Sequence, residues 1–166
     1  MSDVDRLSHT YHAALVRYLT RRLGDRDWAE EVAQETFVRA LRYAPAPEKE
    51  RSWLFAVATN LVRDQARRDT RQRRHLEVLR GEQAEARVES PATTFEQAQE
   101  RAREAALARR AVDALAERDR LALLMREEGL DYPEIAAALG LSVGSVGTTL
   151  ARARRRTRTS RCKEGR

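Results

Sequence analysis

One segment near the end of the chain has the pattern of a helix-turn-helix, and this pattern restricts the fold more than any other feature. Residues 132–156 read YPEIAAALGLSVGSVGTTLARARRR. Gly140 suits the left-handed position that ends a first helix, and Ser142 suits the N-cap of a second. Apolar residues then recur at helical spacing along one stripe of the second helix, formed by Val143, Val146, Leu150 and Ala153. The segment therefore predicts two helices joined by a tight turn.

The opposite face of the second helix carries small and hydroxyl-bearing residues first and arginines behind them. Its members are Ser142, Gly144, Ser145, Thr148, Arg152, Arg155 and Arg156. Short side chains let the N-terminus of a helix approach base edges in the major groove, and guanidinium groups bind phosphates. The face therefore predicts DNA binding, although an ordinary helical hairpin with a solvated basic face has the same pattern.

The charge of the chain favours a polyanionic partner. The 166 residues include 32 lysines and arginines against 26 aspartates and glutamates, which gives a formal net charge of +6. Nearly all the basic residues are arginine, which suits phosphates and base edges, but a GC-rich genome produces the same bias. The single cysteine, Cys162, excludes an internal disulfide framework. No signal peptide or membrane span is visible, so we expect a cytoplasmic protein without membrane insertion.

Helical periodicity continues over the rest of the chain and predicts an all-α protein. We expect helices over residues 5–23, 27–43, from about 51 onward, 95–115 and 119–128. Gly24 suits the end of the first helix, and Asp27 with Glu30 has the spacing of a capping box for the second. Residues 81–93 predict a flexible linker. Two small helical domains, residues 1–80 and 94–166, are therefore expected, the second containing the helix-turn-helix.

The same periodicity predicts which side chains are buried. Tyr43 falls on the buried side of the second helix, and Thr59 falls on the exposed polar side of the third. The candidate core positions of the fourth helix are Phe95, Ala98, Ala102, Ala105, Val112 and Leu115. Each assignment follows from spacing along one helix, without knowledge of its neighbours.

Two exposed faces in the N-terminal half are candidate binding surfaces. The second helix presents an acidic patch around one apolar residue, formed by Glu31, Gln34, Glu35 and Val38. The third helix has a polar face with arginines every turn or so, which includes Asn60, Arg63, Arg67 and Arg74. A charged helix face is often only solvated. The sharper interpretation gives the acidic patch a protein partner and the basic face a phosphate backbone.

Three ordered segments resemble bacterial RNA polymerase sigma factors of the extracytoplasmic-function (ECF) group of the sigma-70 family. They are AEEVAQETFVRALR at 29–42, RSWLFAVATNLVRDQARR at 51–68, and the stretch that covers 121–156. The resemblance implies a subunit that binds core RNA polymerase and directs promoter-specific transcription initiation. It also makes an anti-sigma protein a candidate partner.

The resemblance implies a role for each candidate surface. The acidic patch would bind the polymerase, and Asn60, Arg63, Arg67 and Arg74 would contact the minus-ten promoter element. The outer face of the second helix of the helix-turn-helix would contact the minus-thirty-five element.

The residues do not favour an enzyme. His9, His12 and His75 have no metal-ligand spacing with Cys162, and no glycine-rich phosphate loop is present. We therefore expect no catalytic residue, cofactor or metal. The alternative is a stand-alone helix-turn-helix regulator that dimerises through its N-terminal helices, and a structural helical adaptor is a third possibility. The acidic patch separates the first two hypotheses, because a dimeric regulator needs no polymerase contact.

Overall fold

The computed structural model describes the chain over residues 2–76 and 95–164, with side chains for residues 2–69 and 95–163. In these stretches all regular elements are helical, as expected. The first stretch holds α1 (Asp3–Leu23), α2 (Arg26–Tyr43), the 3-10 helix η1 (Pro47–Lys49) and α3 (Glu50–Leu76). The second holds α4 (Phe95–Asp113), α5 (Glu117–Glu127), α6 (Tyr132–Leu139) and α7 (Val143–Glu164). The linker predicted over residues 81–93 lies outside the described residues.

Local side-chain chemistry sets the ends of the first two helices. The hydroxyl of Ser2 accepts a hydrogen bond from the backbone of Asp5, and α1 ends at Gly24, whose φ is 72°. Helix α2 begins earlier than predicted, because the side chain of Asp25 accepts a hydrogen bond from the backbone of Trp28 at 3.1 Å. The capping box assigned to Asp27 and Glu30 is therefore wrong.

The N-terminal helices pack around a core that contains a buried pair of hydroxyls. Tyr18 of α1 is fully buried, and its ring centroid lies 5.0 Å from that of Phe55 on α3. The Tyr18 and Thr59 hydroxyls lie 2.8 Å apart, and the Thr59 hydroxyl also donates to the Phe55 carbonyl at 2.7 Å. Because these polar atoms are satisfied, they can be buried at little cost. The expectation that Thr59 is exposed is wrong.

Two side chains at helix ends are more exposed than their spacing predicted. Tyr43, expected to be buried, is 67% exposed because it is the last residue of α2, just before Ala44 enters the left-handed region at φ 48°. Its ring stacks on that of Trp53 with centroids 5.2 Å apart. Val143, expected in the apolar stripe, is 49% exposed because it is the first residue of α7. A residue at a helix end lacks neighbours on one side, so helical spacing alone overestimates its burial.

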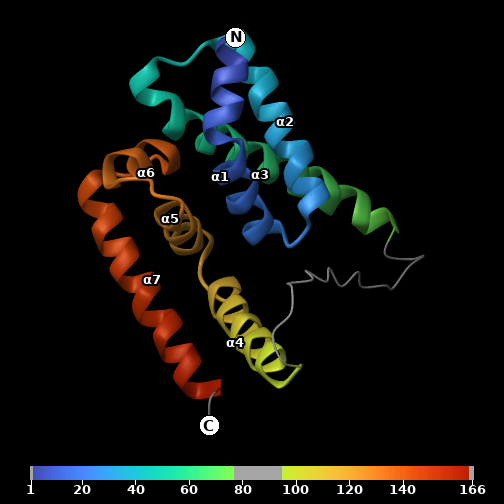
Figure 1. The fold of residues 1–166 in the computed structure, drawn as a ribbon, viewed down its shortest axis with the longest axis vertical. Coiled ribbons are helices and arrows are strands. Elements are labelled where there is room, and N and C mark those ends of the chain that lie inside the picture. The colour runs from blue at the N-terminus through green and yellow to red at the C-terminus, as the bar shows by residue number, and fades with distance from the viewer. Residues whose placement is uncertain (1, 77–94, 165–166) are drawn as a thin grey trace.

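The C-terminal helices form their core around α5, and α4 contributes less than predicted. Its spacing predicted six core positions, but Phe95 is 77% exposed, and Ala98, Ala102 and Ala105 are also exposed. Only the C-terminal part of α4 packs inward, where Val112 is half-buried and Leu115, just after the helix, is buried. Figure 1 shows α4 extending away from the other helices beside the lower part of α7.

The two stretches share one continuous core. Buried residues of α5 and α6, such as Leu121, Met125 and Ile135, belong to the same apolar cluster as Leu15 and Phe55. Helices α5 and α6 pack against α1 and α3, as Figure 1 shows. The described residues therefore form a closed arrangement in which the C-terminal helices cover part of the N-terminal helices.

A glycine substitution in α7 tests the packing of the helix-turn-helix. A Cβ atom added to Gly147 would lie 3.6 Å from the Tyr132 ring, which is an ordinary contact. Because glycine costs a helix about 1 kcal/mol relative to alanine, Gly147→Ala should raise the free energy of unfolding by about 0.5–1 kcal/mol. Gly140→Ala is the control, and it should destabilise the protein by about 1 kcal/mol because the φ of Gly140 is +67°. Urea denaturation measures both, and a loss of stability in Gly147→Ala would contradict this packing.

Candidate nucleic-acid and polymerase interface

The turn between α6 and α7 holds the N-terminus of α7 at the surface. Helix α6 ends at Gly140 in the left-handed conformation, as predicted. The hydroxyl of Ser142 accepts a hydrogen bond from the backbone of Ser145 at 3.2 Å, which confirms its capping role. Gly144, Ser145 and Thr148 are exposed on the first two turns of α7. Small exposed residues at this position allow close approach of base edges.

These residues line a shallow pocket to which α5 adds an arginine. The pocket has a volume of about 380 Å³ and is lined by Arg118, Ser142, Gly144, Ser145, Thr148, Thr149 and Arg152. Arg118 was not among the predicted site residues. It lies far from the helix-turn-helix in sequence, and only the packing of α5 on α7 brings it there. A basic residue beside the small ones increases the positive potential of this surface.

Arg152 has a structural role that the sequence did not indicate. Its guanidinium donates two hydrogen bonds to the carboxylate of Asp119, at 2.9 and 2.6 Å. The side chain of Asp119 is only 1% exposed, whereas that of Arg152 is 40% exposed. These hydrogen bonds hold the pKa of Asp119 below its ordinary value, although burial opposes them. The pair links α7 to α5 and so helps to orient the outer face of α7.

Breaking this pair should have a pH-dependent cost. Arg152→Ala leaves a buried carboxylate without its main partner, so we expect a loss of about 1–3 kcal/mol of unfolding free energy at neutral pH. A lowered native pKa stabilises the fold above the unfolded-state value of about 3.9, and this contribution is lost as the pH falls through the native pKa. The difference between the wild type and Arg152→Ala should therefore shrink in acid. Denaturant titration over this pH range measures it.

Arg155→Ala is the matched control for that change. Arg155 is exposed on the same helix, so its removal should alter stability by less than about 0.5 kcal/mol at any pH. Equal losses in the two variants, or a constant difference across the pH range, would contradict the role of the Asp119 pair.

The predicted DNA-binding residues behind Arg152 remain accessible. Arg155 and Arg156 are exposed on α7, with Arg156 lying 3.9 Å from the Asp119 carboxylate. All seven predicted minus-thirty-five residues thus lie at or after the start of one helix, with small residues first and guanidiniums behind.

The predicted acidic patch lies on the outer face of α2. Glu31, Gln34 and Glu35 are exposed, and Val38 at its centre is 41% exposed. Glu35 accepts a hydrogen bond from Arg39 at 3.1 Å. The apolar part of the surface is larger than predicted, because Leu41 is 58% exposed. An exposed apolar strip with an acidic border is typical of a protein-docking surface.

The candidate minus-ten residues differ in their surroundings. Asn60 and Arg67 are exposed on α3, whereas the side chain of Arg63 is 35% exposed. Arg63 donates from Nε to Glu117 of α5 at 3.1 Å. The side chain of Arg74 lies outside the described residues. Of the predicted face, Asn60 and Arg67 are therefore accessible on α3, whereas Arg63 is held by α5.

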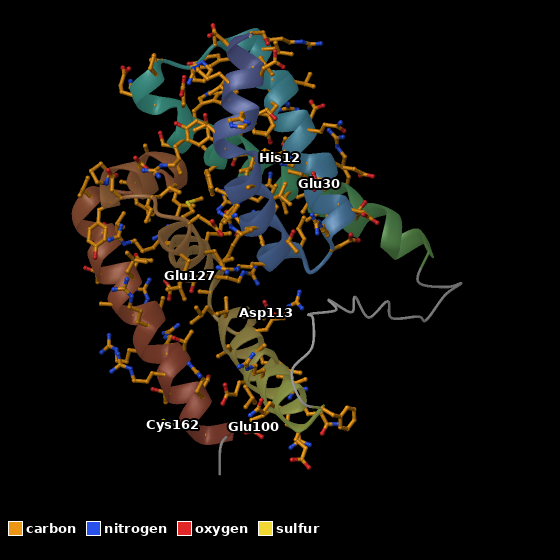
Figure 2. All side chains as sticks on the ribbon, viewed as in Figure 1. His12, Glu30, Glu100, Asp113, Glu127 and Cys162 are labelled. Atoms are coloured by element: carbon orange, nitrogen blue, oxygen red, sulfur yellow. The ribbon has the colours of Figure 1, made fainter. Side chains whose placement is uncertain are left out.

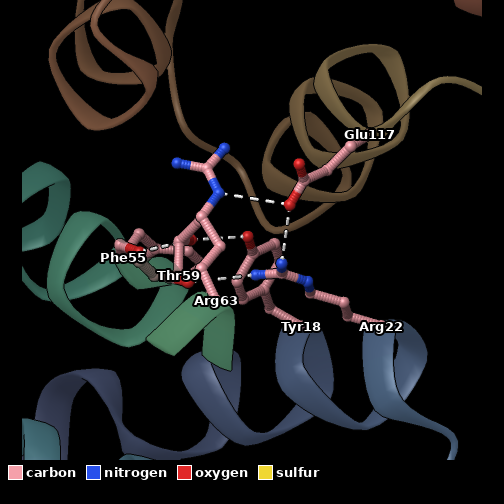
Figure 3. A network of polar contacts seen from close by, with 6 residues as sticks. All are labelled: Tyr18, Arg22, Phe55, Thr59, Arg63 and Glu117. Carbon is pink, nitrogen blue, oxygen red and sulfur yellow. Dashed lines mark hydrogen bonds and ion pairs between the residues drawn. The ribbon is translucent and has the colours of Figure 1, made fainter. Parts of the chain in front are cut away.

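Helical spacing explains why two arginines meet at Glu117. Arg22 lies one turn beyond Tyr18 on α1, and Arg63 lies one turn beyond Thr59 on α3. The contact between the Tyr18 and Thr59 hydroxyls sets these two turns side by side, as Figure 3 shows. Arg22 then donates to the Thr59 carbonyl at 3.3 Å and to Glu117 at 3.0 Å. Burial is the main cause that lowers the pKa of Arg22.

The described residues show no arrangement suited to metal chemistry. No group of three His, Cys, Asp or Glu side chains there could hold a metal ion. Figure 2 shows Cys162 near the end of α7, far from His12 and Glu30 on α1 and α2. In this part of the chain no single helix is long and apolar enough to cross a membrane. Only α6 and α7 up to Lys163, a pair bent by 96°, meet the requirements of length and composition together.

Comparison with known families places both halves of the chain. Residues 7–72 match the model of sigma-70 region 2, and residues 105–157 match that of sigma-70, region 4. The chain is 35% identical over 153 residues to the ECF RNA polymerase sigma factor SigE of Mycolicibacterium smegmatis, covering 89% of this chain and 57% of that protein. It is 30% identical over 159 residues to the RNA polymerase sigma factor YlaC of Bacillus subtilis, covering 92% and 88%.

A solved structure shares the fold. The sigma factor RpoE of Bartonella quintana, crystallised with the anti-sigma factor NepR, aligns with a TM-score of 0.69 at 19% identity, over 96% of this chain and 97% of that chain. Together with the family matches, the relatives identify the class of protein. The chain belongs to the sigma-70 family and is an ECF RNA polymerase sigma factor, a subunit that directs transcription initiation.

Proposed function

We propose that this sigma factor binds core RNA polymerase through the acidic patch on α2, the minus-ten element through α3, and the minus-thirty-five element through the N-terminus of α7. The observation that carries the proposal is the small, exposed first turn of α7, backed by Arg155 and Arg156. The exposed acidic and apolar residues of α2 support the polymerase contact. The protein acts without catalysis in the cytoplasm, and an anti-sigma protein is a further candidate partner.

A stand-alone dimeric regulator is less well supported. Such a protein needs the helix-turn-helix but not sigma-70 region 2, which matches residues 7–72. The exposed patch on α2 would then have no role in transcription initiation. The two hypotheses differ in whether the protein requires polymerase.

In vitro transcription separates these hypotheses. Purified protein is mixed with core polymerase and a pool of genomic fragments, and the transcripts are mapped. We expect initiation at defined sites that share two spaced elements, only when both components are present. Sequence-specific DNA binding without any sigma-dependent transcript would favour the stand-alone regulator.

The patch on α2 gives a direct prediction for polymerase affinity. Replacing Gln34 and Glu35 by alanine removes two exposed side chains and should weaken core binding about ten-fold, as expected for residues central to an interface. The adjacent pair Glu96 and Gln97, exposed on α4, provides a control of the same composition and should leave affinity unchanged. Fluorescence-detected binding to core polymerase, with circular dichroism as a check of the fold, makes the comparison. Equal affinities for both variants would refute the assignment of α2.

Substitutions at the start of α7 and further along it should impair DNA binding in two different ways. Thr148→Ala should change which minus-thirty-five bases are preferred, with a penalty of about 1–3 kcal/mol at the affected position. Arg155→Ala should weaken all sequences alike and reduce the slope of log affinity against log salt by about one unit. Binding of the full-length holoenzyme to a promoter library at several salt concentrations tests both. The reverse pattern, with altered base preference in Arg155→Ala alone, would show that the proposed orientation of α7 is incorrect.

A further inference from the structure

The ion pairs that join the N-terminal and C-terminal helices all have the same polarity. Among the described residues, each arginine belongs to α1 or α3, and each glutamate belongs to α5 or α6 or, in the case of Glu128, directly follows α5. The pairs are Arg17–Glu128, Arg21–Glu127, Arg21–Glu128, Arg22–Glu117, Arg63–Glu117 and Arg51–Glu134. The C-terminal helices therefore present an acidic face to a basic face, as a polyanion would.

Glu117 occupies the part of this basic face that has a proposed role in DNA binding. Its Oε1 atom accepts hydrogen bonds from Arg22 at 3.0 Å and from Arg63 at 3.1 Å. The side chain of Arg22 is only 6% exposed, whereas that of Glu117 is 48% exposed. One oxygen shared by two guanidiniums is the geometry that a phosphate oxygen adopts between two arginines.

Glu117 does not balance the positive charge around it. A pocket of about 530 Å³ at this position is lined by four arginines, Arg22, Arg63, Arg67 and Arg120, and by one acidic residue, Glu117. The Nε atom of Arg120 is buried without a hydrogen-bond partner among the described residues. The pKa of Arg22 is lowered first by burial; Tyr18 and Glu117 raise it, and the neighbouring charges of Arg120 and Arg63 lower it to a smaller extent. Repulsion from Arg120 and Arg63 thus offsets part of the attraction between Arg22 and Glu117.

We propose that Arg22, Arg63 and Arg67 form a phosphodiester-binding site that Glu117 occupies in the free protein, so that promoter DNA must displace Glu117 to bind. This inference rests on the proposed assignment of Arg63 and Arg67 to the minus-ten element, and it adds Arg22 of α1 to that site. Glu117 is a competing internal ligand. Arg120, on the same helix, weakens the binding of α5 at this site, so that a DNA phosphate can replace the Glu117 carboxylate. Domain closure and DNA binding then exclude each other at one set of guanidiniums.

The affinity of the full chain for a labelled single strand of oligo(dT) tests the proposal without polymerase. Glu117→Gln should raise this affinity about three- to ten-fold at low salt, because the two ion pairs that Glu117 makes with Arg22 and Arg63 no longer compete. Glu127→Gln is the matched control, since it removes the same charge from α5 but affects only Arg21, which keeps its pair with Glu128. It should change affinity by less than about two-fold. Equal gains in the two variants would overturn the proposal, because they would reflect net charge alone.

A double-mutant cycle with Arg63 tests the specific contact. In an Arg63→Ala background, Glu117→Gln should lose most of its gain, because the arginine it releases is missing. A gain of the same size in that background overturns the proposal. Glu117→Asp is a second variant that keeps the charge but shortens the side chain, and it should give an intermediate gain. Circular dichroism confirms that each variant is folded.

Two further experiments identify the ligand and distinguish failure of this proposal from failure of the proposed function. Pyrophosphate at matched ionic strength should compete poorly with oligo(dT), and displacement of DNA by pyrophosphate at equal phosphate concentration would mean that the site is for free phosphate. Transcription with core polymerase is measured for the same variants. Normal sigma-dependent transcription without any gain in Glu117→Gln overturns only the Glu117 proposal. Absence of transcription by the wild type overturns the function itself.

Discussion

The contact between the hydroxyls of Tyr18 and Thr59 determines how α1 and α3 meet, and the surface above it depends on that contact. Burial raises the pKa of Tyr18, so its phenol stays neutral and pairs with Thr59 at 2.8 Å. One turn further along each helix, Arg22 and Arg63 come side by side and share Glu117. The basic pocket is thus built from the interior outward, because a satisfied polar pair in the core fixes the positions of the Arg22 and Arg63 guanidiniums.

The same principle operates between α5 and α7. Asp119 is buried and binds Arg152, which fixes α7 on α5. The small residues at the start of α7 can then be presented to DNA on a rigid support, because the helix carrying them is held by an ion pair as well as by Val146 and Leu150 in the core. In both halves of the sigma factor a buried polar contact positions groups that face solvent, and those groups are the ones proposed to touch nucleic acid.

Most features determined by neighbouring residues in sequence were predicted well, although the capping box assigned to Asp27 and Glu30 was wrong. The end of α1 at Gly24, the left-handed Gly140 and the Ser142 cap each depend on a few adjacent residues. Features determined by distant neighbours were not. Thr59 is buried because Tyr18 reaches it, and Arg118 joins the α7 pocket through packing alone. Ala98, Ala102 and Ala105 of α4 had the spacing of a core face, but no described helix covers them. The roles of the candidate site residues stay predictions, since periodicity places a residue on a face without showing what binds there.

The central claim is that the free protein is closed, with α5 and α6 packed on α1 and α3 through a common core and ion pairs of one polarity. Electron–electron double resonance measures it most directly, with one spin label at the native Cys162 and another at His9→Cys, both of which are exposed. The account predicts a single narrow distance distribution for the free protein at low salt, and a shift to longer distances when the labelled chain binds core polymerase and promoter DNA. A broad distribution in the free protein, unchanged by these partners, would contradict it.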